Sequence, residues 1–135
     1  LHSLYGQDHF TEGCMSLLKK IIHETGAVIV LSSTWRTSQE TTRIVNENLA
    51  KYGIQPCVSS TPDYGWQGTR TKEILWWVDQ NDGVASWVAL DDMDLTFPSG
   101  PEGERMKPHF VHTRSERGLT EELAAKAIGI LDGTA

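Results

Sequence analysis

The sequence predicts a single α/β domain built on a three-layer, doubly wound parallel sheet of the Rossmann-like kind. Amphipathic segments with helical spacing alternate along the chain with short apolar runs, as in strands joined by crossover helices. The runs are apolar at consecutive positions, which is typical of parallel strands that helices cover on both faces. The 135 residues, of which 39% are hydrophobic, suffice for one domain with a real core.

The first half of the chain is expected to contain two helices and two strands. Thr11 is placed to cap a helix that stops at Gly26. The run 27–31, Ala-Val-Ile-Val-Leu, predicts a strand covered on both faces. A second amphipathic helix is expected over 38–53, and a short strand follows it over 57–60.

The second half continues the alternation of helices and strands. The expected elements are a helix through Gln80 capped by Thr69 or Thr71, strands over 87–90 and 109–112, and a final helix capped by Thr120. The stretch 95–108 is rich in proline, glycine and charge, so it is expected to be an exposed loop.

Charge and composition exclude several classes of function. Lys and Arg total 12 against 18 Asp and Glu, a formal net charge of −6, which disfavours binding along a nucleic-acid backbone but permits recognition of one phosphorylated end. No apolar run approaches the roughly 20 residues that span a bilayer. The two cysteines form no disulfide or zinc pattern. We therefore expect a soluble, cytoplasmic protein with no membrane partner.

An acidic pair, Asp91 and Asp92, follows directly after an apolar strand, and Asp94 lies close behind. Ligands of doubly wound sheets bind at the carboxyl ends of the strands, so these carboxylates are candidates for a magnesium site. The alternative is a solvated acidic turn, which is the commoner role of an isolated Asp-Asp pair. The strand that precedes the pair favours the metal site, because it directs the charges toward other strand ends.

Two further segments carry candidate phosphate-binding groups. Ser32, Ser33 and Arg36 follow the strand over 27–31, although either serine could instead cap the next turn. Arg70 and Lys72 lie in the first turn of the third helix, where cations oppose the helix dipole and so invite an anion. Together with the acidic pair, these groups suit phosphoryl transfer. The histidines, including His109 and His112, show no ligand spacing and receive no role.

The order of these residues resembles the motifs of the haloacid dehalogenase (HAD) superfamily. Ser32 after Val-Ile-Val-Leu matches the second motif, Lys72 the third, and Asp91-Asp92 the fourth. The strings Val-Leu-Ser-Ser-Thr-Trp-Arg and Ala-Leu-Asp-Asp look like the HAD domain of Swiss-army-knife RNA repair proteins. The resemblance covers nearly the whole chain. It implies a HAD-like, uncapped fold, because neither site of cap insertion has room for a cap domain.

The resemblance also implies roles for the candidate residues. Ser32 would donate to phosphate, Lys72 would neutralise charge with Arg70 as second choice, and Ser33 and Arg36 would help to bind substrate. Asp92 would bind Mg²⁺ directly and Asp91 would act from the outer shell.

The first HAD motif, Asp-x-Asp, has no match in this chain. Asp8 lacks a preceding apolar strand, so we expect the nucleophile to lie in an N-terminal extension that forms the central strand of the sheet. Residues 1–135 would then be one incomplete domain, inactive alone. The expected function is a magnesium-dependent phosphomonoesterase with an aspartyl-phosphate intermediate, acting on an RNA or DNA end or another bulky phosphorylated molecule. The alternative is a noncatalytic module that binds phosphate or metal.

Overall fold

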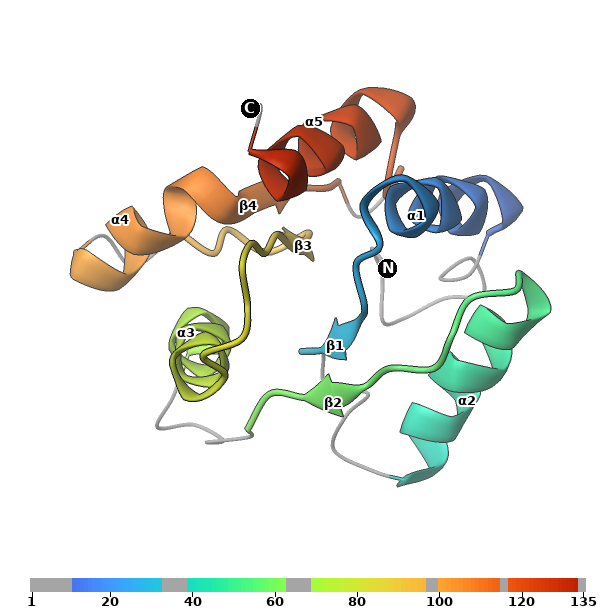
Figure 1. Cartoon of the computed structure of the whole chain (residues 1–135), viewed down its shortest axis with the longest axis horizontal. Coiled ribbons are helices and arrows are strands. Elements are labelled where there is room, and N and C mark those ends of the chain that lie inside the picture. Colours follow the sequence, from blue (N-terminus) through green and yellow to red (C-terminus); the bar gives the residue numbers. More distant parts are fainter. Residues whose placement is uncertain (1–10, 33–38, 63–68, 97–99, 115–116, 134–135) are drawn as a thin grey trace.

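The computed structural model describes residues 11–32, 39–62, 69–96, 100–114 and 117–133, and these form an α/β arrangement of helices around short parallel strands (Figure 1). The described elements are α1 (Glu12–Thr25), β1 (Val30–Leu31), α2 (Gln39–Lys51), β2 (Ser59–Ser60), α3 (Arg70–Gln80), β3 (Ala89–Asp91), α4 (Pro101–Met106), the 3-10 helix η3 (Lys107–His109), β4 (Phe110–His112) and α5 (Glu121–Asp132). None of the described helices is both long and apolar enough to cross a membrane.

Side-chain caps fix the starts of three helices. Thr11, Thr69 and Thr120 have extended backbones, and each accepts a hydrogen bond from the main-chain N–H three residues later. Gly26 ends α1 with a φ of 72°, a left-handed conformation that favours glycine, and its N–H donates to the Ile22 carbonyl. The three predicted helix starts are confirmed, with Thr69 rather than Thr71 as the cap of α3.

The strands pair in parallel, as predicted, but form two sheets rather than one. In the described part of the chain, β1 pairs only with β2 and β3 pairs only with β4. Each pair joins strands that are consecutive in sequence with one described α-helix between them, the crossover unit expected of an α/β fold. The described strands therefore show the parallel pairing but do not confirm the doubly wound sheet, because no described hydrogen bond joins β1 to β3.

Two local expectations were wrong. The run 27–31 is not covered on both faces: only its last two residues form β1, and the side chain of Val28 is 65% exposed. The stretch 95–108 is not an exposed loop, because Pro101 opens α4 at a position where its missing N–H costs nothing. Leu95 and Met106 are buried at 2% and 0% exposure and anchor this stretch to the core.

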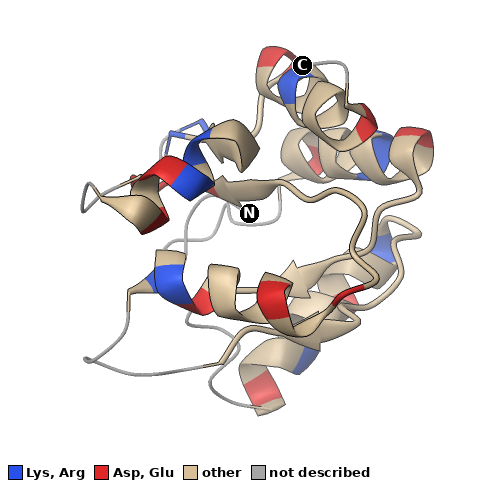
Figure 2. Ribbon diagram, turned by 60° about the vertical axis from the view of Figure 1, so that its left-hand side comes forward, with Lys and Arg blue, Asp and Glu red and all other residues tan. Residues whose placement is uncertain are grey.

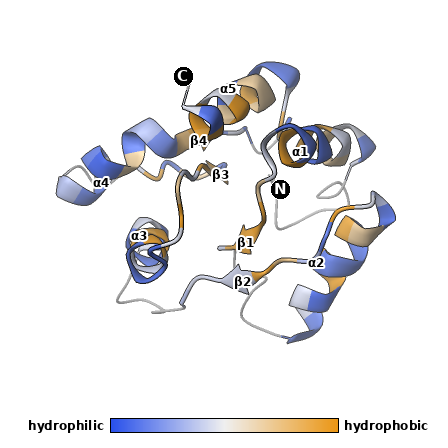
Figure 3. Ribbon diagram, in the orientation of Figure 1, coloured by the Kyte–Doolittle hydropathy of each residue, from blue (hydrophilic) through white to orange (hydrophobic). Residues whose placement is uncertain are grey.

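The buried apolar side chains of the described residues form three clusters. One lies between α1, β4 and α5, a second between α3, β3, β4 and α4, and a third between α1, β1 and α2. Helix α1 belongs to two clusters, since Cys14 and Ile21 pack toward α5 whereas Met15 packs toward α2. Most charged residues lie on the helices (Figure 2), and the segments that lead into β1 and β3 are hydrophobic (Figure 3).

Candidate active site

A cavity of about 560 Å³, here called the central cavity, lies between the two strand pairs. Residues 27–32 line one side and residues 83–92 line the other, so the cavity follows β1 and β3 along their length. Its volume is within the usual range of ligand sites. Polar residues at or directly after the carboxyl ends of strands lie in its lining, namely Ser32, Thr61, Asp91 and Asp92.

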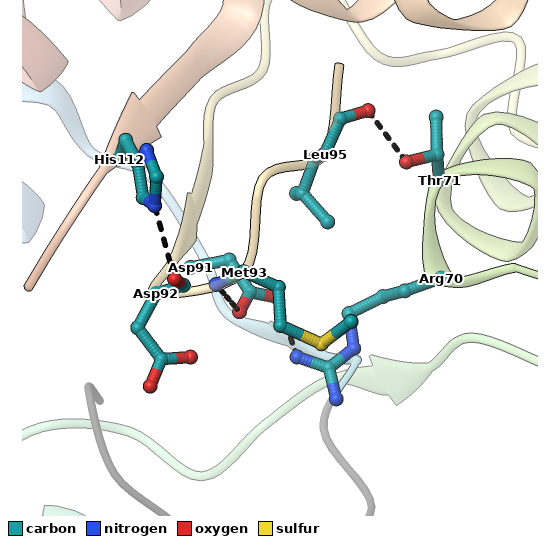
Figure 4. Close-up of polar contacts among 7 residues, drawn as sticks. All are labelled: Arg70, Thr71, Asp91, Asp92, Met93, Leu95 and His112. Carbon is teal, nitrogen blue, oxygen red and sulfur yellow. Dashed lines mark hydrogen bonds and ion pairs between the residues drawn. The ribbon is translucent and has the colours of Figure 1, made fainter. Parts of the chain in front are cut away.

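The main electrostatic contact of this site joins Arg70 to Asp91. The Arg70 guanidinium donates to Asp91 Oδ2 at 2.6 Å, and the two side chains are only 14% and 6% exposed. The other carboxylate oxygen of Asp91, Oδ1, accepts from the Met93 N–H at 3.0 Å (Figure 4). Asp91 therefore uses both oxygens within the protein, as a buried carboxylate must to offset its lost hydration.

A second contact fixes the start of α3 against the turn after β3. The hydroxyl of Thr71, which is 3% exposed, donates to the carbonyl of Leu95 at 2.6 Å (Figure 4). Because Thr71 follows Arg70 directly, the bond holds the first turn of α3 beside the acidic pair. The position of the guanidinium thus depends on the buried Leu95 as well as on Asp91.

The second carboxylate of the pair, Asp92, has different electrostatic surroundings from Asp91. Its pKa is raised, first by partial burial and then by the neighbouring Asp91 carboxylate, and the charge of Arg70 offsets this only in part. Figure 4 shows the Asp92 carboxylate directed away from Arg70 and His112. Asp92 is thus the member of the pair that a divalent cation would stabilise most.

The other predicted residues are placed as follows. Ser32 is half-buried in the lining of the central cavity, whereas the Lys72 side chain is exposed and is not part of that lining. Ser33 and Arg36 lie outside the described residues. Asp94 does not join the acidic pair: its carboxylate accepts from the N–H and hydroxyl of Thr96 on the surface, and these bonds lower its pKa.

His112, which received no role from the sequence, lies at this site. It pairs in register with Asp91 across the two strands, and its Nε2 lies 3.0 Å from the Asp92 carbonyl oxygen (Figure 4). Since a carbonyl only accepts, the imidazole donates this bond from Nε2. The sequence of the strand gave no signal for the contact between His112 and Asp92. The contact depends on which residue of β3 lies opposite His112, and that is set by the pairing of β3 with β4.

Comparison with models of known protein families identifies the family of this chain. The model for the HAD domain in Swiss Army Knife RNA repair proteins matches residues 2–124. The chain belongs to this family. No curated protein and no solved structure matches it. The family match covers the whole region from Ser32 to the acidic pair, so it confirms the HAD relationship that the motif order suggested.

The side chains of this HAD domain that could bind magnesium are few but of a suitable kind. No group of three or more His, Cys, Asp or Glu side chains suited to a metal occurs in the part of the chain that the structure describes. Magnesium often uses only one or two protein carboxylates and takes its other ligands from water and phosphate. The Asp92 carboxylate, with Asp91 next to it, suits that pattern, and bound Mg²⁺ would supply positive charge to a phosphoryl group.

Proposed function

We propose that this HAD domain is a magnesium-dependent phosphohydrolase that acts on phosphomonoesters. The observation that carries the proposal is the central cavity, where a hydroxyl from Ser32, the guanidinium of Arg70 and the acidic pair line one space. A phosphate dianion needs donors and positive charge around it, and these groups offer both. The family of RNA repair proteins favours a phosphorylated RNA or DNA end as substrate.

Each residue has a defined part in the proposed reaction. The Ser32 hydroxyl donates to a non-bridging phosphate oxygen, and Arg70 holds the charge that develops on the phosphoryl group. Asp92 holds magnesium, whereas Asp91 orients Arg70 through their ion pair. An aspartate carboxylate attacks phosphorus and forms an aspartyl-phosphate as the alcohol leaves, and water then cleaves this intermediate; none of the described residues is assigned the attack.

Arg70 replaces Lys72 as our first choice for the cation of the third motif. Residues two apart on a helix point about 200° from each other, so only one of the two can face the acidic pair. Arg70 contacts Asp91 and lines the central cavity, whereas the side chain of Lys72 is exposed. Lys72 therefore provides a matched control, since it is a cation in the same helical turn.

The test uses the full-length protein, assayed with an aryl phosphate and then with 5′- and 3′-phosphorylated oligonucleotides, each with and without Mg²⁺. We expect Mg²⁺-dependent phosphate release, a loss of about 10²–10³-fold in kcat/KM for Arg70→Ala, and less than about fivefold for Lys72→Ala. Circular dichroism confirms that each variant is folded. Turnover lost with Lys72→Ala but retained with Arg70→Ala would reject the assignment of the cation.

The competing function is a module that binds phosphate or metal without turnover. Such a module would use the same Ser32 hydroxyl, Arg70 guanidinium and acidic pair that line the central cavity. Binding of Mg²⁺ or phosphate by calorimetry, with no release from any of these substrates, would establish that alternative and refute the hydrolase.

A further inference from the structure

Met93 presents an exposed apolar side chain at the candidate active site. It directly follows the acidic pair in sequence, and it is 51% exposed. Figure 4 shows its side chain extending toward the side of the acidic pair on which Arg70 lies, away from His112. A phosphorylated molecule held by Arg70 and by a cation on Asp92 would therefore lie next to the Met93 thioether.

Hydrogen bonds hold the main chain around Met93. The Met93 N–H donates to Asp91 Oδ1 at 3.0 Å, and the carbonyl of Leu95 accepts from the hydroxyl of Thr71 at 2.6 Å. Leu95 itself is 2% exposed, so the turn is also anchored by burial. The Met93 side chain thus projects into solvent from a fixed backbone. A ligand that covers it does not have to order the turn first, which favours affinity.

Charge limits the kind of group that can cover Met93. Three carboxylates lie within residues 91–94, namely Asp91, Asp92 and Asp94, and the net charge of the chain is −6. These charges repel additional phosphates of a nucleic-acid backbone. A second contact to a phosphorylated end must therefore involve an uncharged group close to the bound phosphate.

A nucleobase is an uncharged group that suits a methionine side chain. Its faces are aromatic, and a thioether makes favourable contacts with aromatic rings. Every base has such a face, so contacts of this kind tolerate changes of sequence. The sugar next to the phosphate has no aromatic surface. The exposed thioether therefore favours a substrate whose phosphate is followed by a base.

We propose that Met93 is a specificity-determining residue that contacts the base of the terminal nucleotide at a phosphorylated nucleic-acid end. This contact rests on the proposed function, because it places the terminal phosphate at Ser32, Arg70 and Asp92. The base, which the sugar joins to that phosphate, covers the Met93 side chain. The site thus distinguishes ends with a base from ends without one, whatever the base is.

Matched oligonucleotides test the contact on the full-length protein. The probes are trinucleotides phosphorylated at the 5′ or the 3′ end, whose terminal nucleotide carries either adenine or no base. Calorimetry without Mg²⁺ gives Kd, and phosphate release with Mg²⁺ gives kcat/KM. We expect the adenine form of at least one end to bind about tenfold more tightly than its abasic form. Met93→Ser should abolish this preference and change Kd for the abasic form less than twofold.

Two further variants separate an apolar contact from a change in the turn. Met93→Leu keeps an apolar side chain, so Kd for the adenine form should stay within about threefold of the wild-type value. Val58→Ser is the control for loss of an exposed apolar side chain elsewhere, because Val58 is 59% exposed and precedes β2. It should change both Kd values less than twofold. All variants retain the main-chain N–H of residue 93, and circular dichroism checks that they are folded.

The outcomes distinguish the base contact from the proposed function. Failure of every trinucleotide to bind, equal Kd values for adenine and abasic forms, or an adenine preference that Met93→Ser leaves intact would overturn the contact, even if phosphate is released. A preference that depends on Met93, without Mg²⁺-dependent release from either end, would support the contact and count against the hydrolase. Binding of a phosphotyrosine peptide that Met93→Ser weakens, without any base preference, would indicate protein substrates and overturn the contact.

Discussion

The ion pair between Arg70 and Asp91 is the strongest candidate for an electrostatic contact that determines both stability and site geometry. Breaking a buried pair by removing one partner costs about 3–5 kcal/mol, because the remaining charge is left without compensation. Asp91 would retain its bond from the Met93 N–H, and Arg70 is 14% exposed, so the lower end of that range applies. We expect Arg70→Met to lower the free energy of unfolding by about 3 kcal/mol and Tm by about 10 °C.

A double-mutant cycle measures the interaction itself. Urea denaturation of the wild type, Arg70→Met, Asp91→Asn and the double variant should give a coupling energy of about 2 kcal/mol or more. The ion pair of Arg105 with Asp79 is the matched control, because both of its side chains are about half exposed. Arg105→Met with Asp79→Asn should give a coupling energy below about 1 kcal/mol.

Equal coupling energies in the two cycles would contradict the expectation that burial strengthens the Arg70–Asp91 ion pair. Equal values would mean that water reaches Asp91 as readily as Asp79, so burial would not strengthen the contact. A fall in stability for Arg70→Met with no coupling to Asp91→Asn would also refute it, since the loss would then reflect packing of the arginine stem rather than its charge.

Three other changes give independent tests. The raised pKa of Asp92 in the folded state stabilises the protein only while this carboxyl is protonated, so the wild type should lose stability as the pH rises from 4 to 7. Asp92→Asn removes the titrating group and should make this loss smaller, by less than about 1 kcal/mol. Urea titrations of both proteins at the two pH values check this. Thr71→Val should lower the free energy of unfolding by about 1–2 kcal/mol, since the Leu95 carbonyl loses its donor. Thr113→Val should be neutral or stabilising by up to about 1 kcal/mol, because the buried Thr113 hydroxyl has no hydrogen-bond partner in the described structure.

The helices were predictable because their signals are local. Thr11, Thr69 and Thr120 each bond to a main-chain N–H three residues away, so the cap can be recognised without knowledge of the rest of the fold. The helix at Pro101 was missed for the opposite reason. Its composition resembles a loop, and it is held in place by the burial of Leu95 and Met106 against distant residues.

The sequence predicted which segments would meet at one cavity, but not the contacts between them. Apolar strands followed by Ser32 and by Asp91 indicated one crevice, and these residues do line one cavity. The choice between Arg70 and Lys72 depends on the rotation of α3 relative to β3, which the buried Thr71 contact determines. The contact of His112 with Asp92 depends on strand register, which no local pattern encodes.

The pairing of consecutive strands has a consequence for the order of folding. Each pair closes over one described α-helix, so its chain closure costs less entropy than the contact of α1 with α5, which joins opposite ends of the chain. We therefore expect amide hydrogen exchange to report two cooperative units, one around β1 and β2 and one around β3 and β4. Helix α1 packs in a core cluster of each unit, so its amides should exchange only when both units open.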